Sequence, residues 1–379
     1  MLLSLLMAVT ATVAGEPDPF AGPPHGEIDT LIQSAQFGDP GSDAEIEMWL
    51  KGHAHAKPAE RMRLYRRLCA DRSVHGDYAS AALACANAAA LGGDEAQSAA
   101  NNKKLRNSPT IHTIGSARVE LTLNGLGSRD ATVTVNGVSV PWLMDTGAQI
   151  TVVSQSLADK IKVRYFEGGI EVASTTSSVH GGMGLIDLLW IGKAAVENVP
   201  VLVLPDAQLK IGELPQINAI LGLPVMVAFR RAEWLDAGHT LLLGDEAQIV
   251  PTSNPRMYWH AEGIGIPMST ARGMRGAHLD TGANESYLRA PAHELIDAAT
   301  EAAAVTHKGR RGGAGGVVDT EEKVYPTLQL SVAGAALVLK NVSINEQDHE
   351  GAARLGDDVI KQLSVLALDF EHMRVEARK

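Results

Sequence analysis

The pattern of apolar and polar positions changes near residue 116. Before that point, apolar residues recur at helical spacing in "AERMRLYRRLCADR" and "DYASAALACANAAALGG". Asp77 suits the N-cap of the second segment, and the Gly92-Gly93 pair suits its end. The two segments predict helices that pack as a hairpin, and the polar stretch "AANNKKLRNSPT" after them predicts a linker.

Beyond residue 116, short segments rich in β-branched residues alternate with Gly and Asn-Gly, as in "ATVTVNGVSVPWLMD". This composition is typical of strands, and the Asn-Gly between Val135 and Val138 predicts a hairpin turn. A second region of the same kind begins near Trp259. The fold is therefore predicted to be mainly β, preceded by a small α-helical region at residues 16–110.

The two β regions repeat the same features in the same order. Asp145 in "WLMDTGAQ" is followed 77 residues later by Gly222, and Asp280 in "AHLDTGAN" is followed 76 residues later by Gly356. Each Asp-Thr-Gly-Ala precedes a segment expected to be a short helix, "SQSLADKI" or "APAHELIDAAT", and then a Gly-rich stretch. Such a repetition predicts an internal duplication of one β domain.

The duplicated Asp-Thr-Gly-Ala resembles the active-site motif of the aspartic proteases, and its form is most similar to the retropepsin-like branch. The resemblance covers about residues 116–379. It implies a two-lobed acid-protease fold, with one lobe at residues 111–245 and the other at 246–379. It also implies that Asp145 and Asp280 form one catalytic dyad, so that no homodimer is needed.

Two neighbouring carboxyl groups suit the hydrolysis of a peptide bond. The reaction needs a base that activates water and an acid that protonates the leaving nitrogen. Two carboxylates a few ångströms apart cannot easily both ionise, as is known for the aspartic-protease dyad itself, so the pair supplies both functions. The predicted activity is that of an aspartic endopeptidase.

The resemblance also implies supporting roles around the dyad. Gly147 and Gly282 lack a Cβ and allow a close approach to the opposite lobe. The hydroxyls of Thr146 and Thr281 are expected to connect the two loops. The apolar-apolar-Gly segments behind the aspartates are expected at Ile220, Leu221 and Gly222 in the first lobe and at Leu355 and Gly356 in the second.

The Gly-rich stretches are candidates for flaps that close over a bound peptide. The first candidate spans Ser177–Gly184 and the second spans His307–Gly316, and ordinary surface turns are the alternative. The flap residues singled out are Ser177, Val179, His180, Gly181, Gly182, Gly312 and Gly313.

One position departs from the family pattern. Arg354 stands where the second apolar-apolar-Gly segment should carry an apolar residue. Because Asp357 and Asp358 follow it directly, Arg354 is expected to pair with them on the surface.

Residues 1–15 are predicted to be a secretory signal peptide, because "MLLSLLMAVTATVA" is apolar and ends in small residues. No Lys or Arg precedes this run, so the alternative is an apolar N-terminus of a cytosolic protein. Export to the periplasm or beyond would make Cys69 and Cys85, the only cysteines, candidates for a disulfide. Two small buried residues on packed helices are the alternative for them.

The helical hairpin resembles one tetratricopeptide unit, but an array of such units is not found. Residues 16–110 are interpreted either as a propeptide or spacer, or as a module that binds a partner.

Composition and charge exclude several other functions. The net charge of −11 argues against nucleic acid and anionic membranes as partners. No cofactor motif is found, and "HAH" at His53–His55 is better explained as a solvated helix end than as a metal site. We expect a monomer with a peptide or protein substrate, no cofactor, no metal and no stable membrane insertion. The alternative function is a catalytically silent peptide-binding or scaffold protein on the same duplicated fold.

Overall fold

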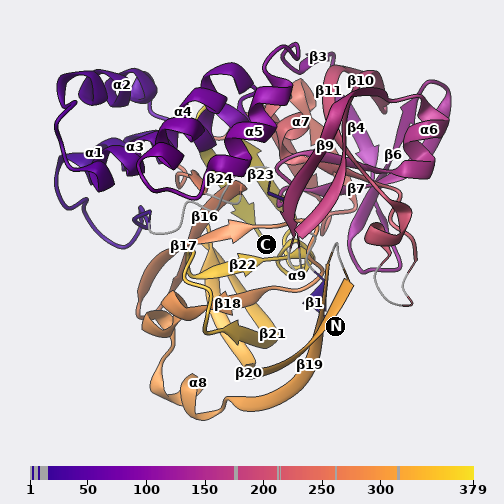
Figure 1. Cartoon of the computed structure of the whole chain (residues 1–379). Helices are drawn as coiled ribbons and strands as arrows, with labels where there is room; N and C mark the ends of the chain where they lie inside the picture. The colour runs from indigo at the N-terminus through magenta and orange to yellow at the C-terminus, as the bar shows by residue number, and fades with distance from the viewer. Residues whose placement is uncertain are drawn as a thin grey trace.

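The computed structural model describes most of the 379-residue chain. A helical region and two β lobes make up the molecule, and the predicted mainly β, two-lobed architecture is confirmed (Figure 1). The described residues are 2–3, 7–8, 16–174, 178–210, 213, 215–260, 263–313 and 316–379. The predicted signal peptide lies almost entirely outside them.

Five helices form the described part of the helical region. They are α1 (Glu27–Gln36), α2 (Ser42–Gly52), α3 (Pro58–Val74), α4 (Tyr78–Ala90) and α5 (Ala96–Leu105). Asp77 caps α4, since its side chain accepts a hydrogen bond from the amide of Ser80. Cys69 on α3 and Cys85 on α4 form a disulfide that joins the two helices.

The prediction of a polar linker after the hairpin was wrong. Helix α5 occupies most of that stretch and packs against α4. Its Asn101 and Asn102 are buried, and the amide of Asn102 donates a hydrogen bond to Oγ of Ser73 at 3.0 Å. Because such partners come from other helices, residue composition alone did not reveal this helix.

The first lobe is built on a ten-stranded sheet in the order β2-β9-β10-β11-β8-β12-β7-β6-β5 with β3 beside β11. The predicted turn at Asn136-Gly137 joins β6 to β7, with positive φ at both residues. The elements from residue 111 onward are β3 (His112–Ile114), β4 (Ala117–Glu120), β5 (Thr122–Leu123), β6 (Arg129–Val135), β7 (Val138–Asp145), β8 (Thr151–Ser154), α6 (Gln155–Ile161), β9 (Arg164–Ser174), β10 (Ser178–Ile191), β11 (Ala194–Leu204), β12 (Ala219–Gly222), α7 (Leu223–Ala228), β13 (Arg231–Leu235) and β14 (Thr240–Leu243).

The second lobe repeats this plan on a nine-stranded sheet in the order β1-β19-β20-β21-β18-β22-β17-β16-β15. The predicted helix in "APAHELIDAAT" is divided into a 3-10 turn, Ala290–Leu295, and the short helix α8, Ala298–Ala302. The other elements are β15 (Tyr258–His260), β16 (Gly263–Thr270), β17 (Gly273–Leu279), β18 (Tyr287–Arg289), β19 (Val305–Gly313), β20 (Gly316–Val332), β21 (Ala335–Asn345), β22 (Ala353–Leu355), α9 (Asp357–Ile360), β23 (Val365–Asp369) and β24 (Arg374–Arg378).

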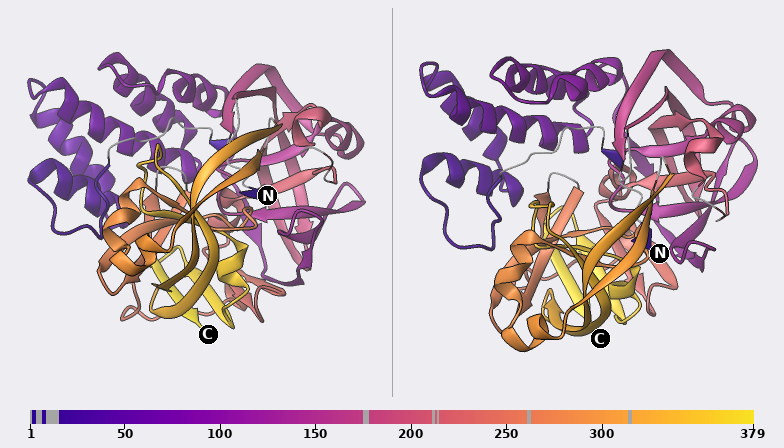
Figure 2. Two further views of the ribbon diagram at one scale, coloured as in Figure 1. Left: turned by 90° about the horizontal axis from the view of Figure 1, so that it is seen from below. Right: turned by 60° about the horizontal axis from the view of Figure 1, so that its bottom comes forward.

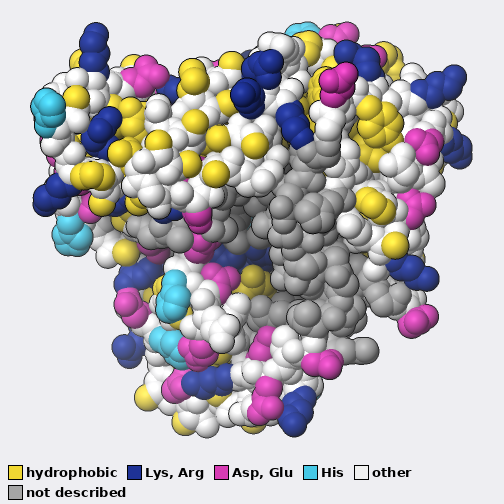
Figure 3. All heavy atoms as spheres, in the orientation of Figure 1, with side chains coloured by type: hydrophobic (Ala, Val, Ile, Leu, Met, Phe, Trp, Pro, Cys, Tyr) yellow, Lys and Arg dark blue, Asp and Glu magenta, His cyan; other side chains and the backbone are white. Residues whose placement is uncertain are grey.

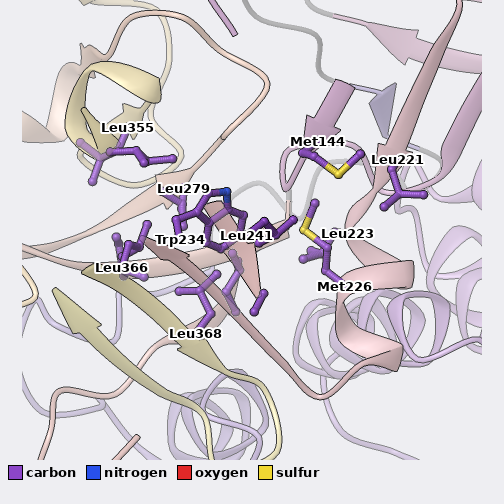
Figure 4. Packing of buried hydrophobic residues seen from close by; sticks show 14 of the residues in the cluster. Met144, Leu221, Leu223, Met226, Trp234, Leu241, Leu279, Leu355, Leu366 and Leu368 are labelled. Atoms are coloured by element: carbon purple, nitrogen blue, oxygen red, sulfur yellow. The ribbon is translucent and has the colours of Figure 1, made fainter. Parts of the chain in front are cut away.

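A third sheet joins the two halves of the chain. Its order is β24-β23-β13-β14-β4, so that strands of the first half pair directly with strands of the second. Figure 4 shows Trp234 and Leu241 of this sheet between Met144 and Leu221 of the first lobe and Leu279 and Leu355 of the second, with Leu366 and Leu368 below them. The apolar core is therefore continuous beneath both Asp-Thr-Gly loops.

The helical region packs against the beginning of the second lobe. Arg67 is buried, and its guanidinium donates a hydrogen bond to the carbonyl of Trp259 at 3.2 Å. Arg256 forms an ion pair with Asp39 at 2.6 Å. On the face in Figure 3, acidic and basic side chains are interspersed over the described parts of the molecule.

A long hairpin projects from each lobe. The hairpin β19–β20 of the second lobe reaches toward the first lobe (Figure 2), where β9 and β10 form the corresponding hairpin. Two short strands of the N-terminal segment pair with these hairpins. Strand β1 (Leu2–Leu3) lies parallel to β19, and β2 (Met7–Ala8) lies antiparallel to β9.

Candidate active site

The two Asp-Thr-Gly-Ala loops follow equivalent strands of the two lobes. In the first lobe, β7 lies parallel to β12 and places Asp145 beside Gly222. In the second, β17 lies parallel to β22, and the amide of Asp280 donates to the carbonyl of Leu355 at 2.9 Å. Each aspartate therefore lies where a central strand ends, at the junction between the lobes.

The glycines behind the loops pack in the same way in both lobes. A Cβ on Gly222 would lie 2.8 Å from the carbonyl oxygen of Ala148, and a Cβ on Gly356 would lie 2.9 Å from that of Ala283. Real Cβ atoms do not tolerate contacts this short. The predicted apolar-apolar-Gly segments thus lie directly behind the Asp-Thr-Gly-Ala loops.

Each motif glycine touches the aspartate of the opposite lobe. A Cβ on Gly147 would lie 2.7 Å from Cγ of Asp280, and a Cβ on Gly282 would lie closer still to Cγ of Asp145. Only residues without a side chain fit at these two positions. The structure therefore brings together the two carboxyl groups that the sequence singled out.

The motif threonines connect the loops across the junction. Oγ1 of Thr146 donates to the carbonyl of Leu279 at 2.6 Å and accepts from the amide of Thr281 at 3.1 Å. Oγ1 of Thr281 donates to the carbonyl of Met144 at 2.8 Å and accepts from the amide of Thr146 at 3.1 Å. Four buried hydrogen bonds hold the two aspartates in register.

Backbone amides of the loops donate to both carboxyl groups. Oδ1 of Asp145 accepts from the amide of Gly147 at 2.8 Å. Oδ1 of Asp280 accepts from the amides of Gly282 and Ala283, both at 3.0 Å. These bonds fix the orientation of each carboxyl group.

The pKa of Asp145 is raised well above its usual range. The largest cause is burial, since the side chain is inaccessible to solvent and an ionised carboxylate would lose its hydration there. The negative charge of Asp280 raises the pKa further, whereas the amide of Gly147 and the charge of Arg354 lower it. Asp145 is thus suited to hold a proton at a pH where ordinary aspartates have lost theirs.

Arg354 is not a surface residue, and the expectation that it pairs with Asp357 and Asp358 was wrong. It is buried, and its Nη1 lies 3.2 Å from Oδ2 of Asp280. Asp357 instead pairs with Arg129 of the first lobe at 2.6 Å and with Lys361 at 2.9 Å. Strand β22 turns its Arg354 side chain toward the lobe junction, which the spacing of charges in the sequence could not reveal.

The flap candidates lie in the two projecting hairpins. Val179, His180, Gly181 and Gly182 belong to β10, paired with β9, and therefore do not form the turn itself. Ser177 lies outside the described residues. Gly312 and Gly313 end β19, and Gly313 pairs with Gly316 across the tip of the second hairpin.

Two residues near the site were missed by sequence reasoning. Oγ of Ser128 donates to the carbonyl of Gly282 at 2.9 Å, and Arg129 crosses the junction to Asp357. Ser128 precedes strand β6, and Arg129 is its first residue. A single Ser-Arg pair at such a place is not a motif that predicts a contact between lobes. They add a buried contact between the lobes on one side of the dyad.

Other kinds of site were also sought. Among the residues that the structure describes, no group of three or more His, Cys, Asp or Glu could hold a metal ion. None of the helices in the described ranges has both the length and the apolar character to cross a membrane.

Comparison with known proteins gave one family and several solved structures. A family model described as aspartyl protease matches residues 131–225, which include the first Asp-Thr-Gly-Ala. The solved structures include basic 7S globulin from soybean, with 12% identity over 70% of this chain and 94% of that chain and a TM-score of 0.48. They also include conglutin gamma, a basic 7S globulin from lupine seeds, with 11% identity over 70% and 95% and a TM-score of 0.46. A sequence search of curated proteins gave no match.

Proposed function

We propose that this chain is a single-chain aspartic endopeptidase in which Asp145 and Asp280 activate water against a peptide bond. The observation that carries the proposal is the contact of each motif glycine with the aspartate of the other lobe, which leaves the two carboxyl groups side by side. The similarity of residues 131–225 to aspartyl proteases supports the same reaction class.

The chemistry follows from a pair that holds one proton. The ionised carboxylate takes a proton from water while the oxygen of that water attacks the peptide carbonyl. The protonated carboxyl polarises the carbonyl oxygen, and a proton from the pair then reaches the leaving nitrogen. One water is consumed, and a carboxylic acid and an amine are released. The raised pKa of Asp145 supports one member of the pair keeping its proton at a pH where ordinary aspartates are ionised.

The projecting hairpins offer a way to hold the substrate. Their outer strands β19 and β9 pair with β1 and β2, so an extended backbone fits against both. A peptide substrate would take this place, with the hairpins acting as the predicted flaps. The N-terminal segment would then have to leave, as it would if residues 1–15 were removed during export.

A second candidate function is a peptide-binding protein without catalysis. Strand addition to the hairpins serves binding as well as cleavage. The paired, buried carboxyl groups favour the enzyme, because burying an ionisable pair costs free energy that binding an extended peptide does not require. The monomeric state and the location outside the cytoplasm belong to the same proposal.

The test is peptide-library cleavage from acid to neutral pH, using both the full chain and the chain starting at Glu16. A statine-type inhibitor and the variants Asp145→Asn and Asp280→Asn serve as controls. We expect inhibitor-sensitive cleavage whose kcat/KM falls at least about 10³-fold in either variant, because each lacks one half of the acid–base pair.

Folding of the variants is checked by circular dichroism and thermal unfolding. Full activity in either variant would reject the dyad. Absence of cleavage by the folded wild type, together with saturable binding of the inhibitor, would favour the peptide-binding protein.

A further inference from the structure

The second lobe carries a cation at a position where the first lobe carries an aliphatic residue. In the first lobe, Ile220 on β12 pairs with Leu143 on β7 and with Val152 on β8. In the second lobe, Arg354 on β22 pairs with His278 on β17 and with Tyr287 on β18. The registers make Arg354 the counterpart of Ile220.

The side chain of Arg354 is held by the site. It is 1% exposed, its Nη1 lies 3.2 Å from Oδ2 of Asp280, and its Cζ lies 5.6 Å from the ring centroid of Tyr287. A buried guanidinium without a nearby carboxylate would be costly, and Asp280 supplies the opposite charge.

Other ionisable groups surround Arg354 from each element that packs around it. His278 on β17 stacks on His260 of β15 at 5.4 Å, and Tyr287 on β18 lies against the guanidinium. Two further charged residues on the described elements have partners of opposite charge: Arg289 on β18 pairs with Asp348, and Asp357 on α9 pairs with Arg129 and Lys361.

Two acidic groups lie near this end of the lobe as well. Asp358 on α9 accepts a hydrogen bond from Ser286, and Glu285 lies close enough to act on it electrostatically. Asp358 thus interacts with Ser286 and Glu285, whereas the ion pair of Arg354 is made with Asp280 of the dyad. The charge of Arg354 thus acts directly on the two facing carboxyl groups.

We propose that Arg354 is a positioning residue of the dyad that binds the carboxylate of Asp280 and thereby leaves the shared proton on Asp145. This inference rests on the proposed function for its catalytic meaning. It gives the pair a fixed polarity, in which Asp280 takes the proton from water and Asp145 starts the reaction as the acid. In a symmetric pair the proton would have no preferred side.

The first test measures the proton directly and needs no catalysis. The full chain is labelled with [4-¹³C]aspartate, and the carboxyl signal of Asp145 is identified by its loss in Asp145→Asn. In the wild type, the upper of the two titration steps of the pair should appear almost entirely on Asp145. In Arg354→Met, this step should move to higher pH, because a neighbouring cation favours loss of a proton, and part of its amplitude should pass to the signal of Asp280, which is identified by its loss in Asp280→Asn. Arg354→Lys, which keeps the positive charge, should restore most of the wild-type titration of Asp145.

The matched control is Ile220→Met, which places the same side chain at the equivalent position of the first lobe and changes no charge. It should leave the midpoint of Asp145 in place. If Arg354→Met fails to fold, Arg354→Gln and Arg354→Lys make the comparison, since both keep hydrogen-bond donors and differ in charge. An equal share of the upper step on Asp145 in the wild type and the uncharged variant would overturn the inference.

The second test is the pH profile of kcat/KM on the best library peptide. A cation beside the pair lowers both macroscopic pKa values of the dyad. Its removal in Arg354→Met should therefore move both limbs of the pH profile of kcat/KM to higher pH. A fall in kcat/KM without such a movement would reduce Arg354 to a structural role and reject the proposal. Absence of cleavage by the wild type would count against the proposed function alone, because the carboxyl titration would still decide the role of Arg354.

Discussion

The loop around Asp145 and the loop around Asp280 share a backbone and differ in their surroundings. Both have a glycine against the opposite aspartate and a threonine bonded across the junction. Beside them, the first lobe has Leu143, Val152 and Ile220, whereas the second has His278, Tyr287 and Arg354. The groups that bring the carboxyls together are duplicated, whereas the residues beside them differ in polarity and charge.

The difference extends to the residue after each glycine of the apolar-apolar-Gly segments. Leu223 and Asp357 donate their amides to equivalent carbonyls, those of Ala148 and Ala283, both at 2.8 Å. Leu223 contributes to the apolar core, whereas Asp357 is fully buried in an ion pair with Arg129. Equivalent backbone positions therefore accept an apolar or a charged side chain, provided that the apolar one is packed in the core and the charged one is paired with an opposite charge.

The largest effect is expected from breaking that ion pair. Among the described residues, Arg129→Met leaves the buried Asp357 paired with the half-exposed Lys361, and it should lower the free energy of unfolding by about 3 kcal/mol. Urea denaturation gives the value. The double variant Arg129→Met/Asp357→Leu, which copies the leucine of the first lobe, should recover most of the loss. A cost below about 1 kcal/mol for Arg129→Met would contradict this account.

A smaller and symmetric effect is expected at the two threonines. Thr146→Val and Thr281→Val each remove two buried hydrogen bonds and keep the volume, so each should cost about 2 kcal/mol of unfolding free energy. The same denaturation experiment compares them. Costs that differ by more than about 1 kcal/mol would show that the junction itself is asymmetric.

A further effect, which appears only when the pH changes, is the pH dependence that Asp145 adds to stability. Its pKa is raised by burial above the ordinary value of 3.8, so its contribution is full below that value and is lost as the pH rises through the raised pKa. Each unit of the rise corresponds to about 1.4 kcal/mol. As the pH rises above 3.8, Asp145→Asn should therefore lose less stability than the wild type.

Thermal unfolding across pH measures this difference. Asp187→Asn is the control, because Asp187 is an exposed aspartate whose removal should leave the slope unchanged. Parallel pH dependences of the wild type and Asp145→Asn would contradict the raised pKa.

Local patterns in the sequence accounted for much of the fold and for the centre of the site. The turn at Asn136-Gly137, the cap at Asp77 and the duplicated motif all follow from short stretches, since the physical cause of each lies within a few residues. The dyad could be located because each aspartate stands in its own Asp-Thr-Gly-Ala motif, two positions before the motif glycine.

Features that depend on distant partners could not be predicted in this way. Helix α5 lies in a stretch whose composition is typical of a linker. It is stabilised by contacts with other helices, such as the hydrogen bond from Asn102 to Ser73. The pairing of β13 with β23 joins residues more than a hundred positions apart. The sequence shows that Arg354 departs from the apolar-apolar-Gly pattern. That its side chain points to Asp280 depends on how β22 lies beside β17, which no local pattern reveals.

The five-stranded sheet that joins the two halves has a consequence for how the site can change by mutation. In a symmetric homodimer, one substitution appears on both sides of the active site, so a guanidinium beside one aspartate would be accompanied by a second beside the other. Here β13 and β23 belong to one polypeptide, and each half of the gene can vary independently. A polarised pair of carboxyl groups is accessible to such a chain by a single codon change, whereas identical subunits would need a new heteromeric partner.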